Sequence, residues 1–557
     1  MTAVHHSLRR TFGIDQLRQG QDEVIHAVLN RRDTLAIMPT GAGKSLCYQL
    51  PALHLEGTTV IVSPLISLMK DQVDKLQDHG LDALQLNSAV PAAEQETTLD
   101  EIEQESSEFV FTTPERLTDS QFLGTLRDAT IDFVVIDEAH CISQWGHDFR
   151  PAYLALQAAL KELGNPPVLA LTATATANVV ADIKRQLGRP AMRVVNTGIY
   201  RPNLWFEVEH VSGDAEKQGE LLRLLEEIQG DGIIYAATVK HVEEVTSFLQ
   251  GEGYELLSYH GRLNRSRRKE AQDRFMAGEL EAIVATNAFG MGIDRPDIRF
   301  VIHYDLPGSL ESYYQEAGRA GRDGEEAWGV LLYDRRDRRT QLFMLGGRYP
   351  TADQLSAVYA ALVDSGSGSS AVSTRDLQVR VPGVARTKTR VALSVLKEAG
   401  VVQERRAGKW SLAKEDVSGE RLVELAREWK ERSERDHEKL ERVEAYARSA
   451  LCRWRVLHDY FQEPMVEELC GVCDNCRRGL AQLAERPVEE RKVEENGRKS
   501  VADAELRLNV GDEVSLPRHG TGRIEEIDEA TLVVRFPDGT ARKFRRDFAR
   551  PVSEDVA

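Results

Sequence analysis

The sequence predicts a multidomain α/β protein in which two tandem lobes with parallel sheets precede several smaller domains. Three observations lead to this prediction. The chain has 557 residues and is 41% hydrophobic, which suffices for about four packed cores. Short β-branched runs alternate with helical patterns, and this rhythm stops near Asn203 and then restarts. Beyond Ser365 the composition changes, which indicates further domains of another kind.

The two lobes are expected over residues 1–198 and 199–345. Apolar strands that alternate with helices are typical of a parallel sheet covered by helices on both faces. In the first lobe we expect strands at Thr34–Met38, Thr58–Ser63, Phe109–Thr112, Phe133–Ile136 and Val168–Leu171. In the second lobe we expect strands at Gly232–Tyr235, Leu256–Tyr259, Ala282–Ala285, Phe300–His303 and Gly329–Tyr333.

Four further segments follow the lobes. In residues 350–415, two short helices and two short strands come after a flexible Gly/Ser stretch, which predicts a winged helix. Residues 418–480 combine a long charged helical region, expected to fold as a hairpin, with a cluster of cysteines. Residues 481–504 are polar and are expected to form a linker. Residues 505–557 contain four strand-like pieces separated by turns, which predicts a small SH3-like or Tudor-like barrel.

The charge distribution limits the classes of partner. A formal net charge of -18 argues against a protein that coats nucleic acid uniformly. The segment Arg375–Lys409 nevertheless holds nine cations and three anions, a local charge of +6. No apolar run is long enough to cross a bilayer, and Met1–Arg10 lacks the core of a signal peptide. We therefore expect a cytoplasmic protein without membrane contact, associated with the nucleoid if the chain is bacterial.

A phosphate-binding loop is expected where the first strand ends. Its small residues let backbone N–H groups reach phosphate oxygens, Lys44 supplies a cation for the outer phosphates, and the Ser45 hydroxyl can ligate Mg²⁺. The sequence therefore predicts an ATP site with Mg²⁺. The residues of this loop are Thr40, Gly41, Ala42, Gly43, Lys44 and Ser45.

Two further groups complete the predicted hydrolytic site. Asp137 and Glu138 close a buried strand, where doubly wound sheets bind ligands. We expect Asp137 to hold Mg²⁺ and Glu138 to orient and deprotonate the attacking water. In the second lobe, Arg319 and Arg322 lie three residues apart on one helical turn. Such a pair can reach across a cleft and neutralise the charge of the transition state.

The cysteines predict a metal site. Four of the six cysteines are Cys452, Cys470, Cys473 and Cys476, and the last three are tightly spaced. Four thiolates are enough for a closed tetrahedral Zn²⁺ site, which we expect to be structural because no ligand position is left open.

Together these motifs resemble the superfamily 2 helicases, and specifically the RecQ family of DNA helicases, over Phe12–Asp334. The resemblance implies two RecA-like lobes. It implies that Arg18 and Gln21 contact the adenine base, that Asp294 belongs to the ATP site, and that Arg322 is the arginine finger with Arg319 beside it.

The resemblance also implies contacts with DNA. Aromatic side chains offer faces on which bases stack. In the family, an aromatic-rich loop couples DNA binding to ATP hydrolysis, and the motor moves 3′ to 5′ on single-stranded DNA. The residues matching that loop are Gln144, Trp145, His147, Phe149 and Arg150. The residues matching other strand-contacting motifs are Thr113, Arg116, His260 and Thr286.

The order of the later modules departs from the family. The cysteine spacing resembles the RecQ zinc module, which in relatives follows the second lobe directly and precedes the winged helix. Here the winged-helix segment comes before the cysteines. We expect duplex contacts from cations on its second helix and wing, namely Arg386, Lys388, Arg390, Arg405, Arg406 and Lys409. We expect DNA or a protein partner at the basic end of the barrel, formed by Arg542, Lys543, Arg545 and Arg546.

Three functions remain open on the sequence alone. The first is an ATP-dependent 3′–5′ DNA helicase acting in recombination, repair or replication. The second is a DNA-stimulated translocase, or an RNA-directed or strand-annealing ATPase, that does not unwind duplex DNA. The third is a regulatory DNA-binding protein with a nucleotide switch. For the helicase we expect single-stranded and duplex DNA as partners, with a single-strand-binding or other repair protein as a further partner.

Overall fold

The chain divides into two compact units, Met1–Arg478 and Gly479–Ala557. None of the helices within the described residues is long and apolar enough to span a membrane. The computed structural model describes residues 2–87, 90, 92–103, 108–143, 149–290, 293, 295–365, 371–405, 409–413, 417–465, 467–485, 510–516, 520–528, 531–537, 539–545 and 550–551.

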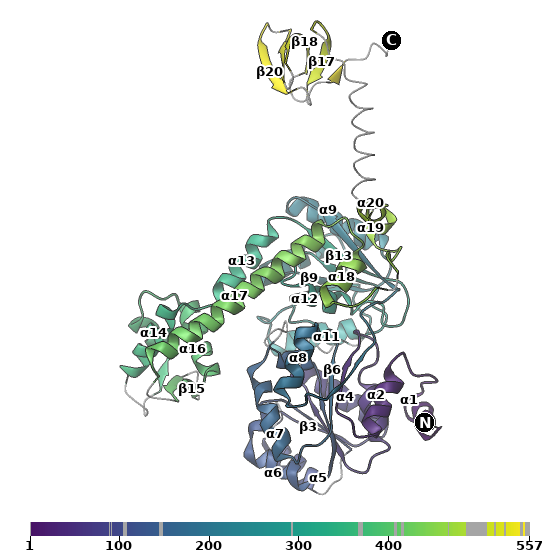
Figure 1. Cartoon of the computed structure of the whole chain (residues 1–557), viewed down its shortest axis with the longest axis vertical. Coiled ribbons are helices and arrows are strands. Elements are labelled where there is room, and N and C mark those ends of the chain that lie inside the picture. Colours follow the sequence, from purple (N-terminus) through teal and green to yellow (C-terminus); the bar gives the residue numbers. More distant parts are fainter. Residues whose placement is uncertain are drawn as a thin grey trace. The chain divides into compact units, whose positions relative to one another are not determined.

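The first lobe is a seven-stranded parallel sheet in the order β3-β4-β2-β5-β6-β1-β7. Its helices lie on both faces of the sheet, as Figure 1 shows in purple and blue. The strands are β1 (Thr34–Ile37), β2 (Thr58–Val62), β3 (Ala83–Leu86), β4 (Phe109–Thr112), β5 (Ile131–Ile136), β6 (Val168–Thr172) and β7 (Arg193–Asn196). The helices are α1 (Thr2–Phe12), α2 (Gln21–Leu29), α3 (Leu46–Ala52), α4 (Ile66–Asp78), α5 (Ala92–Glu103), α6 (Ser120–Asp128), α7 (Leu156–Glu162) and α8 (Ala177–Gln186).

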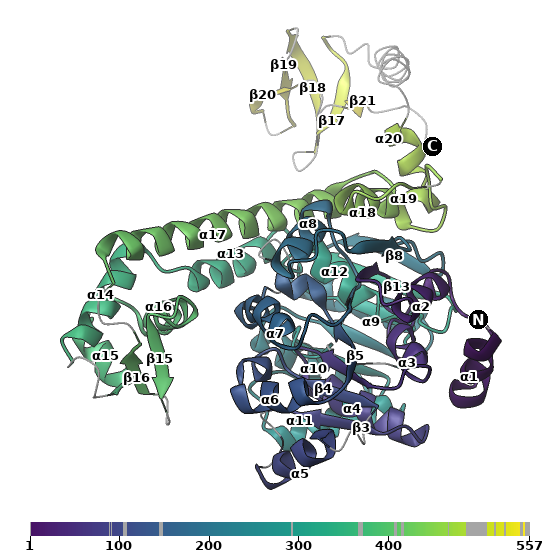
Figure 2. The same cartoon turned by 60° about the horizontal axis from the view of Figure 1, so that its bottom comes forward.

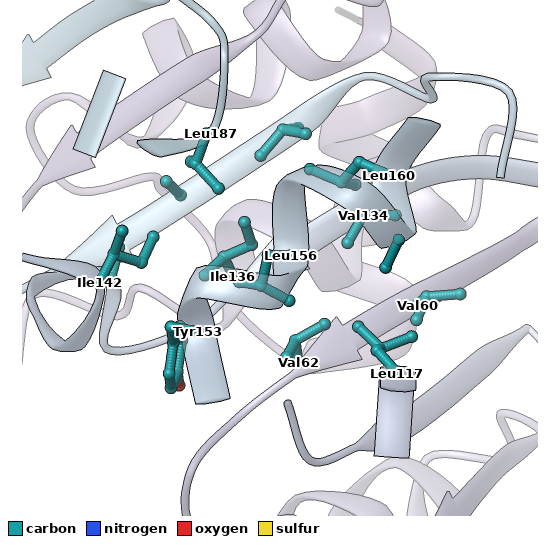
Figure 3. Close-up of a cluster of buried hydrophobic side chains, with 14 of the residues drawn as sticks. Val60, Val62, Leu117, Val134, Ile136, Ile142, Tyr153, Leu156, Leu160 and Leu187 are labelled. Carbon is teal, nitrogen blue, oxygen red and sulfur yellow. The ribbon is translucent and has the colours of Figure 1, made fainter. Parts of the chain in front are cut away.

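Two apolar cores hold this sheet, one on each face. One core packs α2, α3 and α4 against the sheet, and the other packs α6, α7 and α8 against the opposite face. Figure 3 shows part of the second core, where Ile136 at the end of β5 lies among Val62, Leu156 and Tyr153. Because the end of β5 is fixed in this core, the residues that follow it have a defined position.

The second lobe is a six-stranded parallel sheet in the order β10-β11-β9-β12-β13-β8. The parallel sheets of both lobes confirm the predicted α/β class. The strands are β8 (Leu204–His210), β9 (Gly232–Tyr235), β10 (Leu256–Tyr259), β11 (Ala282–Ala285), β12 (Phe300–His303) and β13 (Ala327–Tyr333). The helices are α9 (Asp214–Glu227), α10 (Val239–Gly251), α11 (Arg265–Met276), α12 (Leu310–Ala317) and α13 (Asp337–Arg348).

Three helices and a three-stranded antiparallel sheet follow the second lobe, in the order of elements typical of a winged helix. The sheet runs β14-β16-β15, and the core of this domain includes Leu422 and Leu425 from the next helix. The elements are α14 (Ala352–Val363), β14 (Val372–Ser373), α15 (Thr374–Arg380), α16 (Arg386–Glu398), β15 (Val402–Arg405) and β16 (Lys409–Leu412).

The charged region expected to form a hairpin is mainly one long helix, α17 (Gly419–Arg448), which has 30 residues. The Ser418 hydroxyl caps its first turn by accepting a hydrogen bond from Arg421 N–H. After that turn the helix contains neither Gly nor Pro, and it packs against α12, α13 and α14, so nothing breaks it. Figures 1 and 2 show α17 running beside α13, and together they connect the winged helix to the second lobe.

The four-cysteine module packs on the edge strand of the second lobe. It contains α18 (Arg453–Phe461) and α19 (Asp474–Arg477), while α20 (Leu480–Glu485) belongs to the second unit. Trp454 is fully buried, donates from Nε1 to the Leu204 carbonyl at 3.1 Å, and lies with its ring 5.0 Å from the ring of Phe206. The module therefore extends the core of the second lobe.

Two carboxylates tie this module to the lobes. Asp474 accepts hydrogen bonds of 2.9 Å from the buried Arg453 guanidinium and one of 3.1 Å from Val208 N–H. Glu463 accepts from the Asn196 side chain at 3.1 Å and from Ile199 N–H at 2.8 Å. Glu463 thus holds the segment that links the two lobes.

The second unit contains a five-stranded antiparallel sheet in the order β20-β19-β18-β17-β21. Val514, Ile524, Leu532 and Val534 form its small core. The strands are β17 (Glu513–Leu516), β18 (Gly520–Ile527), β19 (Thr531–Arg535), β20 (Ala541–Arg545) and β21 (Arg550–Pro551).

The buried ion pair between Arg453 and Asp474 yields a stability prediction. Asp474→Ala leaves the Arg453 guanidinium buried without its carboxylate, which costs about 3–5 kcal/mol of the free energy of unfolding. Urea denaturation of the full chain measures this loss. The matched control is Arg478→Ala, which removes an exposed 2.6 Å pair with Glu209 and costs under about 1 kcal/mol. Equal losses in the two variants would contradict the assigned importance of the buried pair.

Candidate functional site

The predicted phosphate loop lies between β1 and α3, at the carboxyl end of a central strand. Gly41 and Gly43 have φ of 84° and 76°, a left-handed conformation that glycine adopts without strain. The Lys44 ammonium donates to the Met38 and Pro39 carbonyls at 3.2 and 3.3 Å. The loop therefore curls around its own lysine.

The acidic pair follows β5, with Asp137 N–H donating to the Val62 carbonyl of β2 at 2.9 Å. Glu138 has a φ of 49°, an uncommon conformation for a residue with a side chain, and such strain gathers at functional sites. His140 Nδ1 lies 3.3 Å from a Glu138 carboxylate oxygen and 3.1 Å from the Thr172 hydroxyl at the end of β6. The His140 ring thus lies between the Glu138 carboxylate and the end of β6.

Burial controls the charges in this site. Burial and the neighbouring Glu138 carboxylate together raise the pKa of Asp137 to about 7. Burial lowers the pKa of the Lys44 ammonium. A buried carboxylate that is expensive to ionise suits a cation, so Asp137 and the Ser45 hydroxyl, which line the same cavity, fit the oxygen ligands of Mg²⁺.

The second lobe contributes Arg322 to the same site. A Cβ on Gly41 would lie 3.0 Å from Arg322 Cγ, so this arginine lies directly against the phosphate loop. Both lobes line a cavity of about 500 Å³. Of the residues predicted for ATP chemistry, the cavity is lined by Arg18, Gln21, Thr40, Gly41, Gly43, Lys44, Ser45, Asp137, Glu138, Arg319 and Arg322.

Arg319 is more deeply embedded than Arg322. It is 6% exposed, and its guanidinium donates to the Gly290 carbonyl within the second lobe. A Cβ on Gly290 would come 2.8 Å from Arg319 Nη2, so the glycine makes room for the arginine. The two arginines of one turn therefore have different surroundings.

Arg201 and Asn203 support the arginine turn, and the sequence prediction missed both. The Arg201 guanidinium donates to the carbonyls of Gly318, Ala320 and Gly321, the first two at 2.7 and 2.8 Å. Asn203 Nδ2 donates to the Gly321 carbonyl at 2.8 Å. Their signal in the sequence was the polar group Arg201-Pro202-Asn203 directly before an apolar strand.

The side chains of Arg18 and Gln21, which the resemblance implies contact the base, bind backbone carbonyls of the phosphate loop. Gln21 Nε2 donates to the Ala42 and Gly43 carbonyls at 3.0 Å each, and the Arg18 guanidinium donates to the Gly41 carbonyl. Gln21 is 2% exposed. These residues therefore brace the loop in this structure.

Three of the described residues that were expected to contact DNA follow the ends of parallel β-strands. Thr113 comes after β4, His260 after β10 and Thr286 after β11, and Thr286 N–H donates to the Tyr259 carbonyl at 3.1 Å. Thr113 and His260 are buried. Arg116 donates to Gln95 at 3.0 Å and to Asp119 at 3.4 Å, so its guanidinium is held within the first lobe.

The aromatic-rich loop is only partly described. Gln144, Trp145 and His147 lie outside the described residues, as does Asp294 in the second lobe. The end of the loop is anchored because Arg150 donates to the Pro64 carbonyl at 3.0 Å. The Phe149 ring lies 5.0 Å from the guanidinium carbon of Arg432 on α17.

Several cations of the winged helix have partners within the protein. Lys388 donates to the Gly346 and Tyr349 carbonyls at 2.5 and 2.6 Å, where it caps the end of α13. Arg405 donates to the Ser411 hydroxyl at 3.1 Å. Lys388 therefore acts as a structural residue here, contrary to the expectation that it faces a duplex. Arg406 and Arg546 lie outside the described residues.

The four cysteines form a compact cluster at the predicted metal site. The Sγ atoms of Cys452, Cys470, Cys473 and Cys476 all lie within 4.8 Å of one another, and all four residues are buried. Cys470 Sγ and Cys476 Sγ are 3.9 Å apart, close to the roughly 3.8 Å edge of a tetrahedron with 2.3 Å zinc–sulfur bonds. Backbone N–H groups of Arg453, Cys470 and Cys473 point at these sulfurs. The cluster fits a closed zinc site.

Comparison with known families gives three matches along the chain. Residues 18–183 match the DEAD/DEAH box helicase family, and residues 216–324 match the helicase conserved C-terminal domain. Residues 415–477 match the RecQ zinc-binding family. The last match begins just before α17 and ends at α19, so it includes the long helix and all four cysteines.

Two relatives come from Bacillus subtilis. The ATP-dependent DNA helicase RecQ is 46% identical over 345 residues, which are 61% of this chain and 57% of RecQ. The probable ATP-dependent DNA helicase RecS is 42% identical over 365 residues, which are 65% of this chain and 73% of RecS. The chain thus spans a little over half the length of RecQ and almost three quarters of RecS.

Solved structures support the fold alone. The DUF1998 helicase MrfA bound to DNA has a TM-score of 0.51 at 19% identity and covers 75% of this chain and 63% of its own. Mycobacterium smegmatis helicase Lhr, bound to single-stranded DNA and AMP-PNP, has a TM-score of 0.50 at 20% identity and covers 74% and 60%. The two lobes, the zinc module and the identity to RecS together show that the chain belongs to the RecQ family of superfamily 2 helicases.

Proposed function

We propose that the protein is an ATP-dependent DNA helicase that moves 3′ to 5′ along single-stranded DNA and unwinds duplexes in recombination, repair or replication. The observation that carries this proposal is the interlobe cavity, which is lined by Lys44, Asp137 and Glu138 from one lobe and by Arg322 from the other. A site completed by both lobes makes hydrolysis depend on how the lobes meet. Membership of the RecQ family supports DNA as the substrate and 3′ to 5′ as the direction.

Hydrolysis would use positioning and charge more than covalent chemistry. Lys44 and the loop N–H groups hold the outer phosphates, and Arg322 neutralises charge that develops on the transferred phosphoryl group. Glu138 orients the attacking water and takes its proton, while His140 keeps that carboxylate in place. Ser45 and Asp137 would hold the Mg²⁺ that accompanies ATP, and this ion would supply further neutralisation of phosphate charge.

DNA would cross the carboxyl ends of strands in both lobes, near Thr113, His260 and Thr286. In the first lobe the aromatic-rich loop follows the acidic pair in sequence. Arg150 at its end donates a hydrogen bond to the Pro64 carbonyl after β2. Base stacking on Trp145 or Phe149 is worth about 1–3 kcal/mol per base, and through this loop bound DNA can influence Glu138. A single-strand-binding or other repair protein is the proposed further partner.

Strand displacement tests the proposal. We expect the full chain to unwind a DNA duplex with a 3′ single-stranded tail, with ATP and Mg²⁺, and to leave a 5′-tailed duplex paired. Gel separation of a labelled strand measures the product. DNA-stimulated ATPase without displacement would instead make the protein a translocase, and unwinding of RNA duplexes alone would make it an RNA remodeller.

Arg322→Ala tests the contribution of the second lobe to hydrolysis. Arginine fingers are worth about 10³–10⁵ in kcat, so DNA-stimulated ATPase should fall by at least about 10³-fold while a fluorescent ATP analogue still binds.

Lys44→Ala should abolish hydrolysis and leave DNA binding intact. Loss of DNA binding in either variant would indicate misfolding, and near-normal ATPase in Arg322→Ala would remove this arginine from the mechanism.

Metal analysis tests the cysteine cluster. Protein purified without chelators should contain about one zinc ion per chain, measured by mass spectrometry of the metal. Cys473→Ser should lose zinc and lower the unfolding midpoint because the cluster supports α18 and α19. Cys141→Ala, which removes a buried thiol of the first lobe, should retain zinc. Zinc-free wild-type protein would contradict the assignment.

A further inference from the structure

A cavity of about 410 Å³ lies next to Phe149, away from the ATP site. Four parts of the chain line it. The first lobe contributes Phe149 and Asn178, the second lobe contributes Glu311, and the zinc module contributes Tyr460. The remaining wall is formed by Tyr349, just after α13, and by a face of α17. The cavity therefore lies where Phe149, at the end of the aromatic-rich loop, is next to α17.

The α17 face of this cavity carries a regular stripe of cations. Arg432, Arg435, Lys439 and Arg442 recur every three or four residues, and such residues lie on one side of a helix. With Trp429 at its start, the stripe covers 13 residue steps, or about 20 Å at 1.5 Å per residue. Each strand of a duplex carries one phosphate per about 3.4 Å of helix axis. The stripe is long enough to contact several consecutive phosphates.

The distribution of charge along α17 favours an anionic ligand at this face. The helix contains eight basic and nine acidic residues, so it is nearly neutral as a whole. Four of the eight basic residues line the cavity, but only two of the nine acidic residues do, Asp436 and Glu438. Asp436 already accepts a hydrogen bond from the Tyr349 hydroxyl. The cations are concentrated where the cavity is.

Aromatic rings accompany these cations. The Arg432 guanidinium carbon lies 4.6 Å from the centre of the Trp429 ring and 5.0 Å from that of Phe149. The Arg442 guanidinium carbon lies 5.4 Å from the centre of the Tyr460 ring. Rings of this kind stack with bases of any sequence, and arginine adds cation–π contacts. Cations beside aromatic faces are the combination that binds single-stranded nucleic acid.

We propose that this cavity binds the DNA single strand, with the α17 cations contacting its phosphates and Trp429, Tyr460 and Phe149 contacting its bases. The proposal rests on the proposed helicase function and adds a strand-binding site outside the two lobes. Because Arg432 touches both Phe149 and Trp429, a strand bound here contacts the end of the aromatic-rich loop and the winged-helix arm together.

The test removes two cations of the stripe from the full chain. Arg435→Gln with Lys439→Gln should weaken binding of a fluorescent single-stranded oligonucleotide by about tenfold at low salt and reduce the slope of log affinity against log salt by about 1 to 2. The matched control is Arg427→Gln with Lys430→Gln, an equal loss of charge from residues of the same helix that do not line the cavity. This control should bind like the wild type, and both variants should keep the wild-type unfolding midpoint.

A second measurement needs no substitution. Ultraviolet cross-linking of an oligonucleotide containing 4-thiothymidine, followed by peptide mass spectrometry, should label peptides that contain Trp429 or Tyr460. Equal affinities and salt slopes for the stripe and control variants, with no label on these peptides, would overturn the cavity site while leaving the helicase function standing. Wild-type protein that binds no single-stranded DNA would overturn both. An affinity loss seen only with an RNA oligonucleotide would assign the cavity to RNA and refute the DNA proposal.

Discussion

The contact between the turn Gly318–Arg322 and the phosphate loop is the constraint on which the nucleotide site depends. A Cβ on Gly318 would lie 3.4 Å from Thr40 Cβ, and one on Gly41 would lie 3.0 Å from Arg322 Cγ. Glycines on both sides let the backbones of the two lobes approach each other. Arg201 fixes the turn by binding three of its carbonyls, so Arg322 is presented from a rigid support.

The zinc module packs on β8 of the second lobe, and α17 packs on α12 and α13. Together they connect this lobe to the rest of the first unit. Trp454 and Asp474 cover β8, while Glu463 holds the interlobe segment at Asn196 and Ile199. This arrangement also explains how a winged helix fits between the lobe and the cysteines. The chain leaves along α13 and returns along α17, so the zinc module still reaches the strand on which it packs. The winged helix lengthens the path of the chain before the module, which packs on β8.

The sequence was informative wherever a pattern is local. Central strands such as β2, in which all five residues are buried, appeared as continuous runs of β-branched residues. The phosphate loop, the acidic pair and the cysteine spacing are equally local, and the structure brings each of these groups together. The strands β3 and β7 were missed because they lie at sheet edges and are partly exposed, so their pattern is weak.

Tertiary contacts determined what the sequence could not predict. The polar group Arg201-Pro202-Asn203 stands out before an apolar strand, but it does not reveal that Arg201 binds a turn 117 residues later. Lys388 lies in a basic segment and was therefore expected to contact DNA. The end of α13 lies close to it, so its ammonium binds the Gly346 and Tyr349 carbonyls there. Similarly, the charged region from Ser418 to Phe461 was expected to form a hairpin, but its first 31 residues contain the single helix α17. Packing against three other helices keeps it continuous.

The packing of Trp454 on β8 has a consequence for synthesis of the chain. Leu204 and Trp454 are 250 residues apart in sequence, and ribosomes add about 5–20 residues per second. Because β8 pairs with β13, the sheet edge forms only after Tyr333 is made, and it then waits about 120 residues, or roughly 6 to 24 seconds, for the helix that covers it. During that interval the apolar side chains of β8, including Phe206, are exposed on a nascent sheet edge, where a chaperone or a premature partner could bind. The winged helix, inserted ahead of the cysteines, lengthens this vulnerable period for every molecule made.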